Sequence, residues 1–228
     1  MLKVISVRVA IIAVSMTFFA HVTGAEIVST ARAAGEGEQN NAFVEACCHG
    51  QMEVMKFLVE KGVDINHKED NGITGLMCAA AFCHPETVEY LLQLGAEVDA
   101  TDGTGETALI KAACKGCVKA VDLLLDKGAY ADTALANGVT SLMCAAANCH
   151  PTILEQLLRG KARVDIADAN GETALIKAAC QGCTEGVKIL LKAGASPDAR
   201  TKNGVTALRC ASATGKLEVV KILMNSTK

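Results

Sequence analysis

Large aromatic side chains are scarce in this chain. Its 228 residues include no tryptophan, two tyrosines and five phenylalanines, although 50% of all residues are hydrophobic. An aromatic core is therefore excluded, and we expect a core of small aliphatic side chains and cysteine. A strong charge of either sign is also lacking, because the formal net charge is −3. No nucleic-acid partner is indicated, since such partners require a clustered basic face.

Long apolar runs are lacking everywhere except at the N-terminus. A short basic start precedes an uncharged apolar stretch over residues 9–20, and small residues follow it. This layout predicts a secretory signal peptide over residues 1–25, with cleavage after Ala25 or after Ala33. The alternative is an uncleaved membrane anchor, which is less favoured because a span needs about 20 apolar residues. We therefore expect an exported protein, periplasmic or secreted, with no other membrane segment.

A period of 33 residues organises the rest of the chain. A glycine, a threonine two residues later and a leucine four residues later keep this step through five copies. An Ala-Ala pair and then a Leu-Leu pair follow in four of them. The apolar spacing indicates two helices in each unit, the second one ended by glycine. Neither helix can bury its apolar face alone, so the units must stack. The glycines that mark the period are Gly72, Gly105, Gly138, Gly171 and Gly204.

The repeated motif Asn-Gly-x-Thr-x-Leu-x-x-Ala-Ala, followed by Leu-Leu and Gly-Ala-x-x-Asp, resembles the ankyrin repeat. The resemblance covers residues 39–228 and implies an all-α solenoid of six stacked helix-turn-helix repeats with β-turn-like connections. Residues 26–38 are then a linker. The fourth unit has Lys161 where others have glycine, which predicts a strained or re-formed helix end. The first and last units depart from the motif as caps do, and the six units are 39–71, 72–104, 105–137, 138–170, 171–203 and 204–228.

The eleven cysteines repeat with a period of two units. Odd and even units carry cysteine at different distances from their glycine, and a cysteine is missing where a terminal unit lacks the neighbour it would face. This pattern predicts one disulfide at each of the five interfaces between units. Cys47 is left over and is predicted to be a small buried thiol. The predicted pairs are Cys48–Cys78, Cys83–Cys117, Cys114–Cys144, Cys149–Cys183 and Cys180–Cys210.

Two alternatives use some of the same cysteines. Cys-x-x-Cys sequences start at Cys114 and Cys180, and such sequences occur in thiol-redox sites and zinc sites. A redox role is disfavoured because both lie at a predicted helix end, where the helix dipole raises the pKa of a thiol. A zinc site would add a Cys-His-Pro motif starting at Cys83 or Cys149, but an oxidising compartment favours disulfides. We expect no cofactor and no bound metal.

No nucleophile with an adjacent base, no phosphate-binding glycine loop and no regularly spaced carboxylate pair is visible, so we expect no enzyme. Similar ankyrin proteins bind partner proteins through their turn tips and first-helix surface. The resemblance therefore implies a monomeric adaptor or inhibitor whose partner is another protein. Its binding residues in the matching slots are Asp70, Asn71, Ile73, Thr104, Glu106, Asn137, Val139, Asn170, Glu172, Lys202 and Val205 on the tips, and Lys111, Lys115, Asn148, Lys177 and Gln181 on the helices. Ile73, Val139 and Val205 share one slot, which suggests an exposed apolar stripe.

Overall fold

The computed structural model describes residues 35–226. The predicted signal peptide and most of the predicted linker lie outside the described residues. Over residues 35–226 the chain forms twelve α-helices, α3 to α14, and no strand, with an isolated bridge between Ala134 and Thr140. The fold is therefore the expected all-α solenoid. No helix in this part of the chain is long and apolar enough to cross a membrane.

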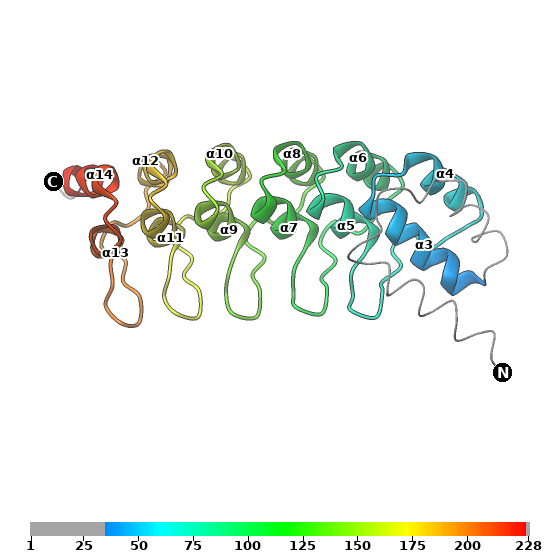
Figure 1. Ribbon diagram of the computed structural model, residues 1–228, viewed down its shortest axis with the longest axis horizontal. Coiled ribbons are helices and arrows are strands. Elements are labelled where there is room, and N and C mark those ends of the chain that lie inside the picture. The colour runs from blue at the N-terminus through cyan, green and yellow to red at the C-terminus, as the bar shows by residue number, and fades with distance from the viewer. Residues whose placement is uncertain (1–34, 227–228) are drawn as a thin grey trace.

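The helices stack as six pairs in one elongated body (Figure 1). One row contains the first helix of each pair, and a parallel row contains the second. Loops project from the first row on the side away from the second row. The first helices are α3 (Glu36–Cys48), α5 (Gly75–Ala81), α7 (Ala108–Lys115), α9 (Ser141–Ala147), α11 (Ala174–Gln181) and α13 (Ala207–Ala213). The second helices are α4 (Met52–Glu60), α6 (Pro85–Gln93), α8 (Val118–Asp126), α10 (Pro151–Arg159), α12 (Thr184–Lys192) and α14 (Leu217–Ser226). Helix α3 begins three residues before the predicted first unit.

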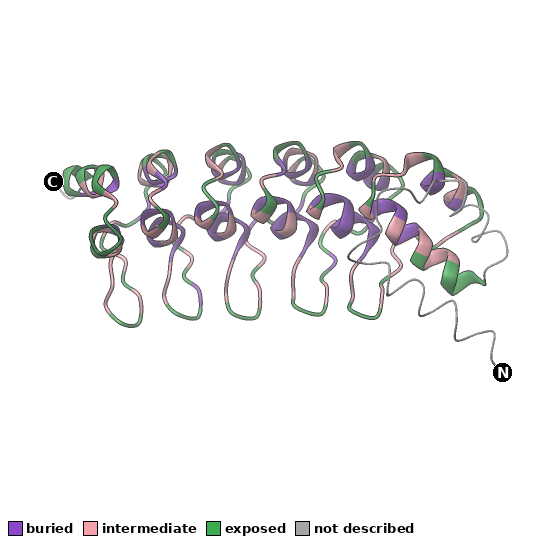
Figure 2. Ribbon diagram, in the orientation of Figure 1, coloured by how far each residue is buried: buried purple, intermediate pink, exposed green. Residues whose placement is uncertain are grey.

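The periodic threonine starts each first helix from α5 onward. Its hydroxyl oxygen accepts a hydrogen bond from the backbone N–H three residues later, as Thr107 does from Ile110 at 3.3 Å. This bond satisfies one of the free N–H groups at the helix start. The Ala-Ala pair that follows is fully buried, as at Ala112 and Ala113, so neighbouring first helices can pack closely. Figure 2 shows buried residues on the first helices and on the inward sides of the second helices.

The second helix of most repeats ends at a glycine with a positive φ, as at Gly95 with φ 86°. The fourth repeat has Lys161 at this position, and the lysine adopts φ 66°. The prediction of a strained helix end is therefore confirmed. A residue with a side chain in this left-handed region costs roughly 1–2 kcal/mol. The strain lies just before the fifth repeat.

The first helix of each repeat also ends at a left-handed residue. It is a glycine in odd repeats, such as Gly50 with φ 63°, but Cys83 and Cys149 take the same conformation in the second and fourth repeats, with φ 58° and 55°. The residue that precedes the next second helix covers this position. After an odd repeat the covering residue lies so close that a Cβ added to the glycine would come within 2.6–2.8 Å of it. These covering residues are His84, His150 and Lys216.

After an even repeat the covering residue is a second cysteine, Cys117 or Cys183. The stack therefore has two kinds of junction. We call those after repeats one, three and five odd–even junctions, and those after repeats two and four even–odd junctions. This alternation explains physically why the cysteines repeat every two units. A glycine accepts a bulky histidine or lysine above it, whereas a left-handed cysteine faces another cysteine.

Candidate protein-binding surface

Five loops, which we call fingers two to six, introduce the first helices from α5 to α13. They comprise residues 66–73, 99–106, 132–139, 165–172 and 198–205. In each of fingers two to five, the first residue is Asn or Asp. Its side-chain oxygen accepts a hydrogen bond from a backbone N–H of the next repeat, 31 residues later, at 2.8–3.0 Å. The base of each of these fingers is thus tied to the following repeat.

Backbone hydrogen bonds also join neighbouring finger tips. The N–H of Gly103 donates to the carbonyl oxygen of Asn71, and that of Lys202 donates to Asn170, both at 2.8 Å. Fingers four and five share the same bond at 2.7 Å. Tip bonds thus join fingers two and three and fingers four to six, but among the described residues none joins fingers three and four. Base bonds link every finger from two to five to the following repeat, which limits the movement of the exposed side chains relative to one another.

Side chains inside the fingers shape the turns in two alternating ways. In fingers two and four the asparagine before the glycine accepts from the backbone two residues later, as Asn71 does from Ile73 at 2.9 Å and Asn137 does from Val139 at 3.2 Å. In odd fingers the accepting side chain is an aspartate three residues before the periodic glycine. Asp168 accepts from the N–H groups of Asn170 and Glu172, both at 2.9 Å, and Asp102 does the same in finger three.

An ion cluster fixes each odd finger to the helix that follows. The Lys111 ammonium lies 2.8 Å from Asp102 and 2.5 Å from Glu106, and its side chain is only 13% exposed. Lys177 makes the equivalent two contacts in the fifth repeat. Burial alone would raise the pKa of Asp102, but hydrogen bonds from Lys111, Thr104 and the backbone outweigh it and lower the pKa to about 2. Burial would lower the pKa of Lys111, but its bonds to both carboxylates raise it.

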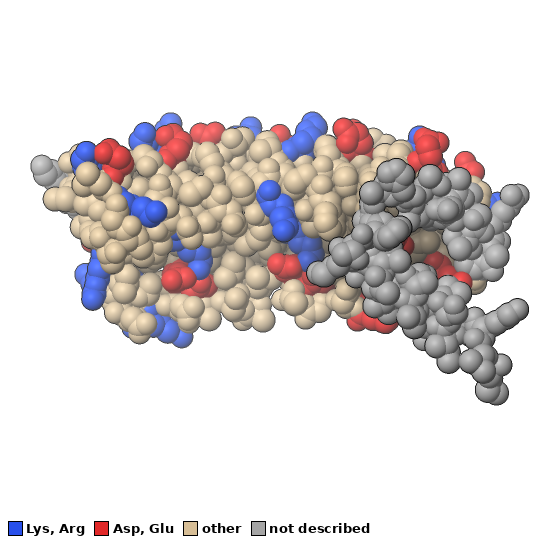
Figure 3. Space-filling model, viewed as in Figure 1, with Lys and Arg blue, Asp and Glu red and all other residues tan. Residues whose placement is uncertain are grey.

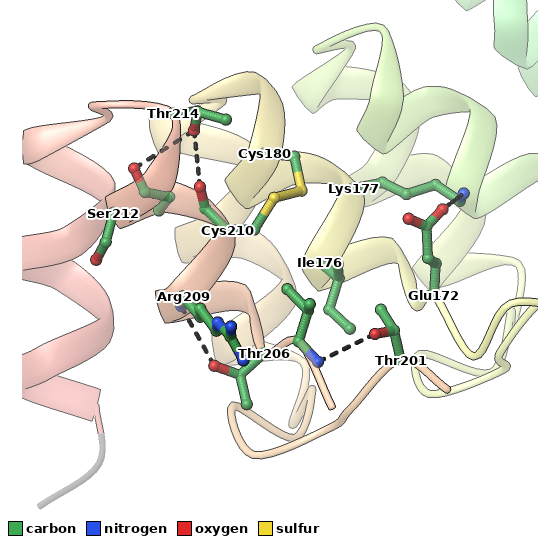
Figure 4. Close-up of a disulfide and its surroundings, with 12 residues drawn as sticks. Glu172, Ile176, Lys177, Cys180, Thr201, Thr206, Arg209, Cys210, Ser212 and Thr214 are labelled. Atoms are coloured by element: carbon green, nitrogen blue, oxygen red, sulfur yellow. Dashed lines mark hydrogen bonds and ion pairs between the residues drawn. A yellow bond between two sulfur atoms is a disulfide. The ribbon is translucent and has the colours of Figure 1, made fainter. Parts of the chain in front are cut away.

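Disulfides cross four of the five junctions. Their Cα–Cα distances are 4.6–5.1 Å, within the range that a disulfide requires. Figure 4 shows the bond between Cys180 on α11 and Cys210 on α13, with both cysteines on facing sides of adjacent first helices. The four bonded pairs are Cys48–Cys78, Cys83–Cys117, Cys114–Cys144 and Cys180–Cys210.

The fifth expected disulfide, Cys149–Cys183, is not formed. Cys149 is an exposed thiol and Cys183 is a buried one, although the two sulfurs are hydrogen-bonded. The Cys183 sulfur lies beside Gly186. A Cβ added to Gly186 would lie 3.0 Å from the Cys183 sulfur and 3.1 Å from Leu154 Cδ1. The missing methyl leaves space for the sulfur beside Gly186.

A model of the family described as ankyrin repeats matches residues 18–102, 43–135, 94–168 and 142–228. The chain belongs to the ankyrin-repeat family. The chain is 27% identical to an ankyrin repeat domain from Acinetobacter baumannii, with a TM-score of 0.74 over 81% of this chain and 97% of that one. It is 28% identical to the human ASB11 ankyrin repeat domain, with the same TM-score over 82% and 83%.

A third similar structure is the complex of the predatory endopeptidase Bd0816 from Bdellovibrio bacteriovorus with the immunity protein Bd3460. The matched chain is 31% identical, with a TM-score of 0.74, and the match covers 80% of this chain and 96% of that one. No curated protein sequence matches the chain.

The predicted binding residues divide into two groups on this ankyrin-repeat surface. The first group consists of nine predicted residues on the fingers and first-helix surface whose side chains are exposed. Others are held within the chain: Lys111, Lys177, Glu106 and Glu172 belong to the ion clusters. The exposed residues are Asp70, Asn71, Thr104, Lys115, Asn137, Asn148, Asn170, Gln181 and Lys202.

The predicted apolar stripe is not exposed. Ile73, Val139 and Val205 are half-buried, and the first two pack against the core. Val205 instead helps to line a groove of about 490 Å³ between fingers five and six.

That groove brings together three more of the predicted residues, Asn170, Glu172 and Lys202, with Ile176 and the Cys180–Cys210 disulfide beside them. Figure 4 shows Ile176 and the disulfide next to each other on this side of α11. The groove is therefore lined by both polar and apolar residues.

Sequence analysis missed Phe82, which is 61% exposed. It occupies the helix-end slot that holds Lys115, Asn148 and Gln181 in the next three repeats. Phe82 lies at the same repeat position as three predicted binding residues, and this could have identified it from the sequence. Figure 3 shows that charged side chains gather along the edge formed by the second helices and on the fingers, whereas the middle of this face is largely uncharged.

In neither Cys-x-x-Cys sequence are the two cysteines bonded to each other. Cys114 is bonded to Cys144 and Cys180 to Cys210, so each cysteine of a Cys-x-x-Cys sequence faces a different neighbouring repeat. Over residues 35–226 no group of three or more His, Cys, Asp or Glu side chains is placed to hold a metal ion.

Proposed function

We propose that this ankyrin-repeat protein is an exported protein-binding scaffold that acts as an adaptor or inhibitor through its fingers and first-helix surface. The observation that carries the proposal is the ordered row of fingers: the bases of fingers two to five are tied to the next repeat, and three of the four neighbouring pairs of tips are joined, by hydrogen bonds of 2.7–3.0 Å. A preordered surface loses little conformational entropy when it binds, and this improves affinity.

The residues at the exposed ends of the first helices favour a protein as the binding partner. Phe82, Lys115, Asn148 and Gln181 follow one another along the stack and include an aromatic residue but only one charge. Protein interfaces are enriched in aromatic residues and depleted of charge at their centre. Phe82, as the large exposed apolar residue of the four, is the expected energetic anchor.

Two observations favour an inhibitor that works outside the cytoplasm. The chain is similar to a chain in a complex of an endopeptidase with an immunity protein. Four disulfides cross its junctions, and disulfides persist in exported proteins but are rare in the cytosol. The signal-like N-terminus agrees with export.

Capture of the partner from the exported fraction tests this function. The bait is the full chain, compared with the triple variant Phe82→Ala/Lys115→Ala/Asn148→Ala. A control triple, Lys119→Ala/Glu155→Ala/Lys192→Ala, changes exposed residues of the second helices. We expect one stoichiometric partner for the wild type and the control, and an affinity at least about tenfold weaker for the first triple.

Equal binding by both triples would contradict the assigned surface. The absence of any stoichiometric partner in the exported fraction would contradict the scaffold function itself.

A further inference from the structure

The junction between the fourth and fifth repeats is the only one in residues 35–226 that no disulfide crosses. Repeats one to four form one covalently linked block, and repeats five and six form another. Only packing, hydrogen bonds and the chain itself connect the two blocks. The thiols of Cys149 and Cys183 lie at this connection.

The backbone at this junction is already suited to a disulfide. Cys149 has φ 55°, and the equivalent Cys83, which is bonded, has φ 58°. Cys183 precedes α12 with φ −74° and ψ 80°, and the bonded Cys117 precedes α8 with φ −81° and ψ 74°. The two thiols are hydrogen-bonded to each other. The two cysteines therefore have the backbone conformation of a pair that is bonded elsewhere in the stack.

Two of the differences between the junctions lie at positions equivalent to residues that pack beside the Cys183 sulfur. The second and third repeats have Val88 and Ala120, whereas the fourth and fifth have Leu154 and Gly186 at the same positions. The larger leucine and the smaller glycine compensate for each other. The Cys183 sulfur lies over the glycine, where an added Cβ would come within 3.0 Å of it, so the glycine leaves room for the sulfur in its unbonded position.

We propose that Cys149 and Cys183 form a thiol–disulfide exchange site that reacts with disulfides such as glutathione disulfide and reversibly links the fourth and fifth repeats. This inter-repeat pair is distinct from either Cys-x-x-Cys sequence, because Cys180 is bonded to Cys210. Its substrate is a small disulfide or the exposed disulfide of an oxidoreductase, and glutathione disulfide is the probe.

The reaction proceeds in two exchange steps. Exposed Cys149 loses its proton to solvent, and its sulfur attacks one sulfur of glutathione disulfide, which breaks that S–S bond and releases one glutathione thiolate. Buried Cys183 then loses its proton and attacks the Cys149 sulfur of the mixed disulfide. The second glutathione leaves as a thiolate, and both thiolates take up protons. Two cysteines are oxidised by two electrons in all, and one disulfide is reduced to two thiols.

The environment of Cys149 explains how the thiols persist beside four disulfides. Burial of its sulfur raises the pKa of Cys149, and the hydrogen bond with Cys183 raises it further, while the positive charge of Lys216 acts in the opposite direction. Burial and the hydrogen bond both disfavour the thiolate, which is the form that attacks a disulfide.

Titration of the full chain with glutathione buffers tests the site. The ratio of oxidised to reduced glutathione is varied, thiols are trapped with iodoacetamide, and peptide mapping follows each pair. We expect Cys149–Cys183 to open under conditions at least about tenfold less reducing than those that open Cys83–Cys117. Opening of both pairs at the same ratio would overturn the proposal, and so would free Cys149 and Cys183 thiols in excess glutathione disulfide.

Two matched variants exchange the packing residues. Leu154→Val/Gly186→Ala recreates the Val88 and Ala120 pair, and we expect its Cys149–Cys183 bond to open only at the ratio that opens Cys83–Cys117. Val88→Leu/Ala120→Gly should make Cys83–Cys117 open earlier. If both variants leave the ratios unchanged, the packing explanation is wrong and the proposal falls with it.

Cys183→Ser gives a readout that does not depend on repacking the core. Without the second thiol the mixed disulfide cannot resolve, so intact mass should show one added glutathione, mapped to Cys149. Cys149→Ser should gain none, because Cys183 is buried. A Cys183→Ser variant that gains no glutathione would contradict exchange at Cys149.

Discussion

Residues 72–137 and 138–203 are two copies of one two-repeat unit, and their central junctions differ. Both contain Leu-Met-Cys-Ala-Ala-Ala followed by Cys-His-Pro and then Ala-Leu-Ile-Lys-Ala-Ala-Cys. The backbone at the paired cysteines is the same within a few degrees of φ at the left-handed residue. Nevertheless, the first junction is bonded and the second is a dithiol. A matching backbone is thus not sufficient for a disulfide here, and side-chain packing decides whether it forms.

Other differences also weaken the second copy near its junction. Lys161 takes the left-handed position that Gly95 holds in the first copy. Gln156 is buried where the first copy has Tyr90, and its Oε1 has no hydrogen-bond partner among the described residues. Residues expected to reduce the stability of this junction therefore cluster in repeat four. The following variants test this contrast, in order of decreasing effect.

Removal of each cysteine pair should give the largest difference between the copies. Cys83→Ala/Cys117→Ala opens a bond with a sequence separation of 34 residues, which costs about 3–4 kcal/mol in the chain-entropy model. Cys149→Ala/Cys183→Ala removes two thiols only and should cost about 1 kcal/mol or less. Urea unfolding without reductant measures both. Equal losses would mean that the second pair is bonded in solution.

Loss of an ion-cluster aspartate should affect both copies alike. Asp102→Asn or Asp168→Asn leaves a mostly buried lysine with one carboxylate, and we expect each to lower the free energy of unfolding by about 2 kcal/mol. Both lysines are 13–16% exposed, so the two losses should match within about 0.5 kcal/mol. A much smaller loss in the second copy would extend the contrast beyond the sulfur atoms.

Acid should weaken both clusters through the aspartates. The folded pKa of Asp102 is about 2, below the ordinary value near 4. The stabilisation is therefore complete above pH 4 and lost as the pH falls towards 2, with a change of about 1–2 kcal/mol. The pKa of Asp168 is lowered in the same way, since bonds from Lys177 and the backbone outweigh the effect of burial. Urea midpoints from pH 5 to 2 measure this, and Asp102→Asn/Asp168→Asn should flatten the dependence.

Exchange of the helix-end residues should have the smallest effect. Lys161→Gly relieves the left-handed side chain and should raise the free energy of unfolding by about 1 kcal/mol, while Gly95→Lys should lower it by about the same. Thermal unfolding of both variants checks the signs. A destabilised Lys161→Gly would show that the lysine side chain contributes more than its backbone strain costs.

The sequence predicted those parts of the structure that depend on one repeat or on its period. The threonine caps, the Ala-Ala and Leu-Leu faces and the closing glycines are local signals, and the solenoid follows because every unit carries them. The strain at Lys161 was also predicted, since the left-handed position was known from the other repeats. The parity of the cysteines pointed to the pairs that the structure bonds at four junctions.

The features that the sequence did not predict depend on contacts between residues at different positions of the repeat. The 33-residue period gives no information about such contacts. Lys111 was assigned to the binding surface because its slot lies on the first helix, but Asp102 reaches it from a finger nine residues earlier. The fate of Cys183 depended on Gly186 and on Leu154 of the preceding repeat. Phe82 was overlooked because its slot holds a different residue type in every repeat.

The alternation of glycine and cysteine at the ends of the first helices restricts how a stack of this kind can change its length. Loss of a single repeat would place two repeats of the same parity next to each other. A histidine would then cover a left-handed cysteine, or cysteines would lose the partners with which they form disulfides. Loss of residues 72–137 would instead bring Cys48 opposite Cys144, which has the same place in its repeat as Cys78. Shorter or longer descendants of this chain should therefore differ from it by whole blocks of 66 residues.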